Sequence, residues 1–301
     1  MRRLMVGVSA LLAGLVLAGC GAPAGLDGDL LDDWKPMGEP EAFVPPAGVC
    51  YPDDFAETAY VSSFTPVDCT SSHRFETVHV GTFTGAVADR AKPPAQGSAD
   101  LRSAFNACDG KASDYVGAQW RSARLWLGVA IPSAPAWGSG ARWYRCDLVE
   151  VSEISDEEGE PVTRTASLKG ALTGDSPLLL RCFVVQLDAQ GGVFAVKPTD
   201  CKAKHNAEYV GVWSSPAASF PAKDRDWLPF YGGCRAAVGR YVGVPVDGML
   251  QYRTGVLTLP APRPDWQAGN HGVRCYLWMR NRDLDRSLKD AGTAGLPIQY
   301  R

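Results

Sequence analysis

The sequence predicts an α+β protein of two similar small domains, each an antiparallel sheet packed by one helix and stapled by two disulfides. Eight cysteines form two series of four, and the first gap is 19 residues in both series. Short motifs recur in the same order along both series, which is typical of a duplicated domain. We expect the copies to span residues 47–174 and 175–301, a usual length for one hydrophobic core. The cysteines are Cys50, Cys69, Cys108, Cys146, Cys182, Cys201, Cys234 and Cys275.

Four motifs occur once in each predicted domain. The first, Asp-Cys-x-x-x-His-x-x-Glu-x-Val, contains His73 and Glu76 in one copy and His205 and Glu208 in the other. The others are Tyr-Val-Gly at 115–117 and 241–243, Pro-x-Trp-x-x-Gly at 135–140 and 264–269, and Ser-Leu-Lys at 167–169 and 287–289. The Pro-x-Trp motif places Trp137 with Gly140, and Trp266 with Gly269, at the same distance before the fourth cysteine of each copy.

Hydrophobic patterns place similar elements in each copy. Alternating apolar residues predict strands, and apolar residues three and four positions apart predict one helix per copy. Ser98 or Asp100 is the candidate N-cap of the first helix. The predicted strands are 77–83, 124–130 and 143–151, then 178–187, 208–213, 250–259 and 273–279, and the predicted helices are 100–115 and 224–241.

These eight cysteines are expected to be oxidised, because their number is even and the chain is predicted to be exported. Pairing within one copy leaves three schemes. The favoured scheme joins first with second, bridging neighbouring strands, and third with fourth, pinning the helix to the sheet. Each bond closes a loop of roughly 20 to 40 residues, which is worth about 3 to 4 kcal/mol in the chain-entropy account.

The N-terminus resembles a bacterial lipoprotein signal peptide. A positive start precedes an uncharged apolar run over 4–17 and the lipobox Leu-Ala-Gly-Cys, which ends at Cys20. We expect residues 1–19 to be removed and Cys20 to be lipidated, which places the protein on the extracytoplasmic face of the cell membrane. An ordinary signal peptide with a chance cysteine is the alternative. Residues 20–46, rich in glycine, proline and acidic residues, are predicted to be a lipidated, disordered tether.

The repeated pattern resembles the septum formation domain family of actinobacteria. The resemblance rests on a first cysteine, Cys-x-x-x-His-x-x-Glu, a helix with the third cysteine and Tyr-x-Gly, and Trp-x-x-Gly before the fourth cysteine. It covers nearly everything beyond the tether. Asp68 and Asp200 stand where the family commonly has proline. The resemblance implies a role in cell division or envelope biogenesis and no established reaction.

The Cys-x-x-x-His motif also raises the possibility of a reactive site. Zinc needs about four ligands, which the cysteine and histidine of both copies would have to supply together. Because the same sulfurs are expected in disulfides, we favour an oxidised cysteine beside a histidine that hydrogen-bonds a turn. Glu76 or Glu208 would orient that histidine. A catalytic pair of these two carboxylates is the other alternative, and we expect neither catalysis nor a bound metal.

Tryptophan is frequent, with 9 residues. Trp137 and Trp266 recur in both copies and are expected in the cores. Five others do not all recur, and they offer an alternative, an aromatic groove between the copies that holds a glycan strand or a peptide edge. These five are Trp120, Trp126, Trp213, Trp227 and Trp278.

The sequence therefore predicts a non-catalytic, surface-exposed lipoprotein with a binding or scaffolding role at the envelope. Its expected partners are the membrane, through the lipid anchor, and envelope or divisome proteins or peptidoglycan. Nucleic acid is not expected, because the net charge is −3 and no basic stripe occurs. The alternatives are a peptidoglycan- or glycan-binding module and an extracytoplasmic hydrolase or metal-dependent enzyme, and no cofactor is expected.

Overall fold

The computed structural model describes residues 38, 41–154 and 159–299. The predicted signal peptide, Cys20 and most of the predicted tether lie outside these residues. Contacts divide the chain into Met1–Glu41 and one compact unit, Ala42–Arg301. Within the described part, no helix has both the length and the apolar character needed to cross a membrane.

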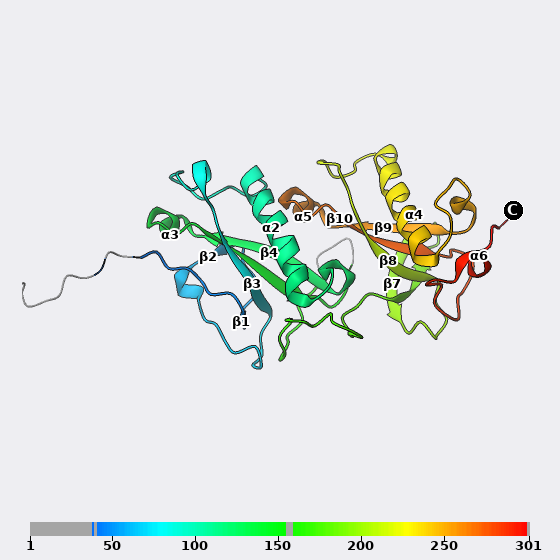
Figure 1. Ribbon diagram of the computed structural model, residues 1–301, viewed down its shortest axis with the longest axis horizontal. Helices are drawn as coiled ribbons and strands as arrows, with labels where there is room; N and C mark the ends of the chain where they lie inside the picture. Colours follow the sequence, from blue (N-terminus) through cyan, green and yellow to red (C-terminus); the bar gives the residue numbers. More distant parts are fainter. Residues whose placement is uncertain (1–37, 39–40, 155–158, 300–301) are drawn as a thin grey trace, which may run out of the picture. The chain divides into compact units, whose positions relative to one another are not determined.

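The first half of the compact unit is a mixed five-stranded sheet with one long helix against it (Figure 1). Its order is β1 (Val49–Tyr51), β3 (Phe75–Thr82), β5 (Trp143–Glu150), β4 (Leu125–Pro132) and β2 (Thr58–Ala59). Only the pairing of β2 with β4 is parallel. The helix α2 (Ala99–Val116) begins after Ser98, whose hydroxyl accepts from the amide of Leu101, and ends at Gly117, where φ is 86°. Ser98 rather than Asp100 is therefore the N-cap.

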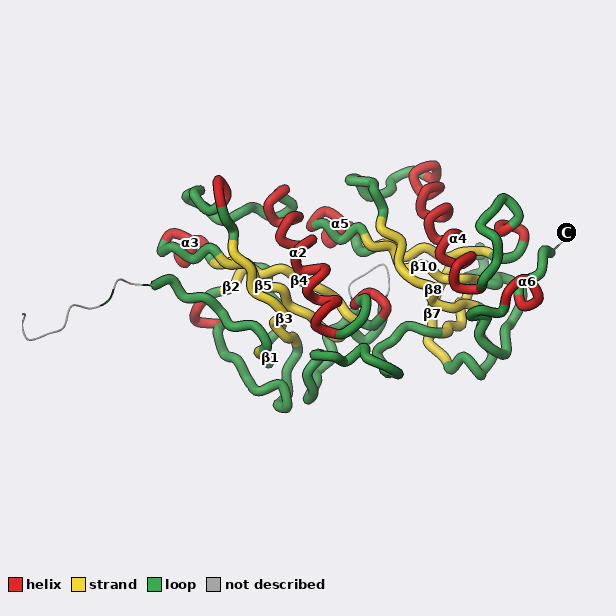
Figure 2. Tube along the Cα trace, viewed as in Figure 1, coloured by secondary structure: helices red, strands yellow, loops and turns green. Residues whose placement is uncertain are grey.

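The second half repeats this plan with a second sheet, and Figure 2 shows the helices and strands of both halves. Its order is β7 (Val193–Thr199), β6 (Cys182–Leu187), β8 (Ala207–Ser214), β10 (Gly272–Trp278) and β9 (Gly255–Pro260), all antiparallel. The helix α4 (Leu228–Val242) packs against it and ends at Gly243. Four strands and the helix correspond one to one between the halves, so the structure is α+β with two related sheets.

Three predicted elements of the second half begin too early. The predicted strand 178–187 starts only at Cys182, because the residues before it hydrogen-bond to the backbone of the first half. The predicted helix 224–241 starts with a 3₁₀ helix, Asp224–Trp227, and α4 follows with a proline in its first turn. Proline fits there because the first helical amides have no partner within the helix. The predicted strand 250–259 starts only at Gly255, because the side chain of Asp247 accepts from the amide of Met249 and a 3₁₀ turn follows.

The two sheets differ at their edges for a reason that is visible in the sequence. In the first sheet, the amides of Ile131 and Ser133 donate to carbonyl groups in the segment of β2. Val129 pairs with the fourth cysteine of the first half, and Thr258 pairs with that of the second half. Two and four positions further along the strand, the second sheet has Pro260 and Pro262. Proline has no amide hydrogen. The edge of β9 therefore lacks both donors that hold β2, and the extra strand β7 joins the opposite edge instead.

The favoured disulfide pairing is confirmed in both halves. The third and fourth cysteines join α2 to β5 and α4 to β10, as expected. The first pair differs in one respect, because the second cysteine lies in the turn of the histidine motif and not in a neighbouring strand. The four bonds are Cys50–Cys69, Cys108–Cys146, Cys182–Cys201 and Cys234–Cys275.

Candidate functional site

Glu76 is the centre of a buried hydrogen-bond network in the first half. Its side chain lies on β3 and is 0% exposed. It accepts from the hydroxyl of Tyr115, from the Oγ of Ser167 at 2.6 Å and from the amide of Leu168 at 2.6 Å. Three of the four repeated motifs therefore meet at one carboxylate.

Glu208 has the same surroundings in the second half. It accepts from the hydroxyl of Tyr241 at 2.7 Å, from the Oγ of Ser287 at 2.8 Å and from the amide of Leu288 at 2.8 Å. The Nε2 of His205 adds a fourth contact at 3.2 Å. Because a buried carboxylate is stable only when its oxygens are hydrogen-bonded, the repetition of these motifs has a structural explanation.

The two motif histidines hydrogen-bond to turns, as the sequence predicts. The Nδ1 of His73 lies 2.8 Å from the carbonyl of Ser71, and the Nδ1 of His205 lies 2.8 Å from that of Ala203. Glu208 also contacts its histidine, whereas the Nε2 of His73 has no hydrogen-bond partner among the described residues. The predicted orienting role of the glutamate is thus seen in the second half only.

The tyrosines of the networks are held protonated. Burial, and after it the hydrogen bond to Glu76, raises the pKa of Tyr115 to about 12. Burial likewise raises the pKa of Tyr241. Each phenol therefore remains a donor to its carboxylate at neutral pH.

The described residues around these networks do not form the zinc site or the catalytic carboxylate pair that the sequence offered as alternatives. Two groups of potential metal-binding side chains lie close together, Cys50 with Cys69 and Glu76, and Cys182 with His205 and Glu208. Each group belongs to one half, not to both, and its sulfurs are in disulfides, whereas zinc binds thiolate sulfur. The Glu76 and Glu208 carboxylates are each buried in their own network and do not form a catalytic pair.

The repeated tryptophans lie in the cores, as predicted. Trp137 and Trp266 are buried, and the Nε1 of Trp137 donates to the carbonyl of Arg90 at 2.7 Å. Each lies in a short helix that the sequence pattern did not predict, α3 (Ala134–Gly138) and α5 (Arg263–Ala268). Gly140 and Gly269 follow these helices with φ of 97° and 114°, a backbone conformation that favours glycine.

A second set of residues joins the two halves. The buried Arg121 donates through Nε and Nη2 to the Oδ1 of Asn270, at 2.9 and 2.6 Å, and also contacts Asp109. The Nε1 of Trp126 donates to the Oδ2 of Asp265 at 2.8 Å. These contacts connect β4 and the turn before it with α5 and the turn after it.

Arg274 on β10 extends this contact between the halves. It is 6% exposed, its Nε donates to the carbonyl of Arg121, and its Nη2 donates to that of Leu125, both at 3.0 Å. Burial lowers the pKa of Arg274. Its guanidinium also lies 5.7 Å from the ring of Trp120, within the range of a cation–π contact.

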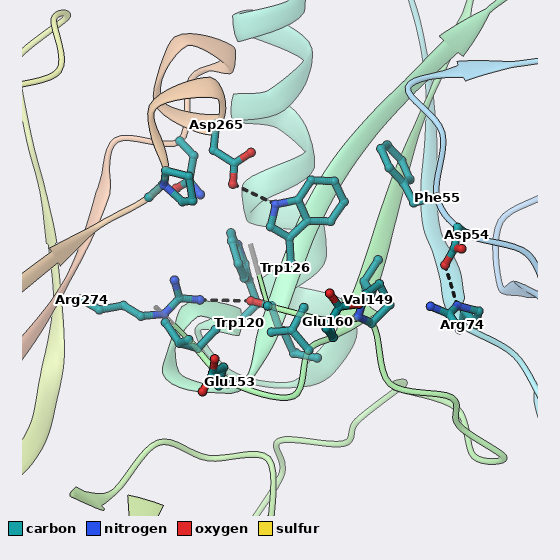
Figure 3. A pocket seen from close by; sticks show the side chains of 18 residues that line it. Asp54, Phe55, Arg74, Trp120, Trp126, Val149, Glu153, Glu160, Asp265 and Arg274 are labelled. Carbon is teal, nitrogen blue, oxygen red and sulfur yellow. Dashed lines mark hydrogen bonds and ion pairs between the residues drawn. The ribbon is translucent and has the colours of Figure 1, made fainter. Parts of the chain in front are cut away.

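A cleft of about 340 Å³ opens between the two halves beside these contacts (Figure 3). Trp126 and Phe55 form part of its wall, with ring centroids 4.9 Å apart and an edge-to-face arrangement. Gly128 makes their position possible, because a Cβ there would lie 2.5 Å from the ring of Phe55 and 2.6 Å from that of Trp126. Both rings are only half-buried, so the wall offers an accessible aromatic surface.

The rest of the cleft is polar and mostly acidic at its rim. Asp54 and Arg74 form an ion pair 2.6 Å long on the side of Phe55. Glu153 and Glu160 are exposed at the same cleft, and Asp265 and Arg274 line it from the second half (Figure 3). An aromatic wall with a few convergent polar groups is the usual composition of a small-ligand site.

The sequence predicts this cleft only in part. Of the tryptophans expected in a groove between the copies, Trp120 and Trp126 line the cleft. The other three pack against the core of the second half or line a different hollow: Trp213, Trp227 and Trp278. Phe55 and Asn270 carried no signal, because they belong to no repeated motif and join Arg274 only in the folded chain. An arginine directly before the fourth cysteine of each copy was the one available hint.

Comparison with known proteins gives a family match. The model of a family described as septum formation matches residues 47–275. The matched range contains both histidine motifs, all eight disulfide-bonded cysteines and the cleft between the halves. No curated protein and no solved structure matches the chain.

Proposed function

Because the chain belongs to the septum formation family, we propose that it is a non-catalytic envelope lipoprotein that binds or scaffolds other components during cell division or envelope biogenesis. The family supports the link to division. The lipobox at Cys20 supports an anchor on the extracytoplasmic face of the cell membrane. Of the predicted tether 20–46, the part before Ala42 would serve as the tether, because the compact unit begins at Ala42 and the carbonyl of Phe43 accepts from Trp143. The disulfides fit an oxidising location.

The cleft between the halves is the observation that carries the binding role. Half-buried aromatic rings, a charged rim and buried polar side chains occur together there. The repeated histidine and glutamate residues, in contrast, have structural partners within each half. We therefore place binding in the cleft, and we assign stability to the motifs.

Of the alternatives, glycan or peptidoglycan binding is favoured by a specific observation. The aromatic wall of the cleft with its polar rim has the composition that a saccharide site requires. The hydrolase and the metal-dependent enzyme have no comparable support among the described residues, because the candidate carboxylates are enclosed and the candidate sulfurs are oxidised.

Proximity labelling in intact cells tests the proposed function. The protein is fused to a labelling enzyme on its C-terminal side, and its labelled neighbours are compared with those of the Cys20→Ala variant. We expect division proteins to be enriched around the wild type and this enrichment to be lost in the variant. A uniform distribution around the cell without such neighbours would contradict the proposal.

A further inference from the structure

We propose that the cleft between the two halves is a saccharide-binding site, in which Trp126 stacks against a sugar ring and Asn270 and Arg274 donate hydrogen bonds to its oxygens. This inference rests on the proposed binding function and assigns its ligand class. The three residues come from β4, from the turn after α5 and from β10, so the site exists only where the two halves meet.

The aromatic wall supplies one face of the site. A pyranose ring is amphipathic, since its C–H groups form an apolar face while its hydroxyls point to the sides. Trp126 is half-buried, and its Nε1 is fixed by Asp265 at 2.8 Å. Phe55 packs edge-to-face against it. The indole is therefore held in one orientation before any ligand arrives, which lowers the entropic cost of binding.

The floor of the cleft supplies hydrogen-bond donors that the protein itself does not use. Asn270 is 3% exposed, and its oxygen accepts two bonds from Arg121. Since a guanidinium only donates, the orientation of the amide is fixed and its Nδ2 faces away from Arg121. Among the described residues, neither this Nδ2 nor the Nη1 of Arg274 has a hydrogen-bond partner. Both residues line the cleft.

The combination of groups favours a saccharide over other ligands. Sugar hydroxyls both donate and accept, so they match the donors of the floor and the carboxylates of the rim at once. Phosphate groups of a nucleotide would meet an acidic rim. A purely apolar ligand would leave the buried donors unpaired, which is costly.

An extended peptide is the competing ligand. Peptides commonly bind by adding a strand to an open sheet edge. β10 is paired on both sides, whereas β4 is paired along its length only with β5, and β2 reaches only its last two residues. Because the carbonyl of Leu125 at this edge already accepts from Arg274, we favour the saccharide and make peptide binding an outcome of the test.

Titration of the full-length protein with a panel of neutral oligosaccharides tests this assignment. The panel contains tetramers built of N-acetylglucosamine, glucose, mannose or arabinose, and binding is followed by calorimetry and tryptophan fluorescence. We expect at least one of them to bind, with an affinity at least tenfold lower in Trp126→Ala. Asn270→Asp retains an oxygen for Arg121 but loses the donor, and it should weaken binding by a similar factor.

Trp278→Ala is the matched control. Like Trp126, Trp278 is a partly buried tryptophan on a strand, but it lies in the second sheet and lines a different hollow. Its affinity should equal that of the wild type. The assignment is overturned if no member of the panel binds, if Trp126→Ala binds as tightly as the wild type, or if only extended peptides bind. Any of these results would leave the proximity experiment with Cys20→Ala unaffected, so the ligand class and the envelope function fail separately.

Discussion

The carboxylates of Glu76 and Glu208 each gather donors from distant parts of the chain. The amide of Leu168 lies 92 positions after Glu76, and that of Leu288 lies 80 positions after Glu208. Each glutamate therefore fixes the last part of its half against an inner strand of the sheet. Removing the acceptor would leave buried donors without partners, which costs more than a surface hydrogen bond contributes.

The substitution Glu208→Ala should lower the free energy of unfolding by about 3 kcal/mol, since one buried and two partly buried donors lose their acceptor at about 1 to 3 kcal/mol each. Glu208→Gln keeps one acceptor oxygen and should cost less. Urea denaturation monitored by fluorescence measures both. Glu57→Ala, on an exposed side chain, is the control and should change little. Equal stability of Glu208→Ala and the wild type would show that the network is not structural.

Alkaline pH should destabilise the protein through the network tyrosines. The ordinary pKa of tyrosine, about 10, applies to the unfolded chain, and the folded state raises the pKa of Tyr115 to about 12. Between these values the unfolded state has lost a proton that the folded state retains, so the free energy of unfolding falls as the pH rises. Below about pH 10 this contribution is fully present.

Denaturation midpoints measured in steps from about pH 9 to 12 test this dependence. The variant Tyr115→Phe cannot titrate at this position, and its midpoint should fall less steeply with pH than that of the wild type. Parallel pH profiles for the two proteins would mean that Tyr115 does not carry the effect.

At the scale of single elements, glycine has opposite roles in β4 and α2. A Cβ at Gly128 would clash with Phe55 and Trp126, whereas one at Gly110 would meet nothing within 4 Å. Gly128→Ala should therefore displace the aromatic wall and cost about 1 to 3 kcal/mol. Gly110 is an exposed position of α2, and Gly110→Ala should stabilise the protein by about 1 kcal/mol.

Thermal unfolding measures both effects: the melting temperature should fall in Gly128→Ala and rise in Gly110→Ala. The same proteins report on the ligand site, because Gly128→Ala should also weaken oligosaccharide binding while Gly110→Ala leaves it unchanged. A Gly128→Ala variant with wild-type stability and affinity would show that the two rings move aside without consequence.

The elements that depend on local chemistry were predictable from the sequence, and those that depend on long-range contacts were not. The ends of α2 follow from Ser98 and Gly117. The matched cysteine spacing indicated the two copies but left three pairing schemes in each, of which the favoured one is present. The strand β2 has only two residues, and it forms because the amides of Ile131 and Ser133 are free to donate to it. No local pattern encodes that, and the same is true of the position of Phe55 in the cleft.

At the scale of the whole molecule, one pair of equivalent residues distinguishes the halves. Arg145 and Arg274 each precede the fourth cysteine of their half, and both are buried. Arg145 forms an ion pair with Asp147 at 2.7 Å inside its own sheet. The second half has Tyr276 in place of Asp147, and Arg274 donates to carbonyl groups of the first half instead. The equivalent arginine thus stabilises one sheet in the first half and joins the two halves in the second.

This difference predicts distinct unfolding behaviour for two matched variants. The wild type should unfold in a single calorimetric transition, because its described residues beyond position 41 form one compact unit. Arg274→Met removes two hydrogen bonds between the halves and should separate this transition into two, or raise the ratio of calorimetric to van't Hoff enthalpy above one. Arg145→Met leaves the buried Asp147 without its charge partner, with only the hydroxyl of Thr77 still donating to it. It should cost about 3 to 5 kcal/mol, yet preserve a single transition. If Arg274→Met also unfolds in one step with an unchanged enthalpy ratio, the halves are coupled by other contacts, and the cleft does not depend on this arginine for its geometry.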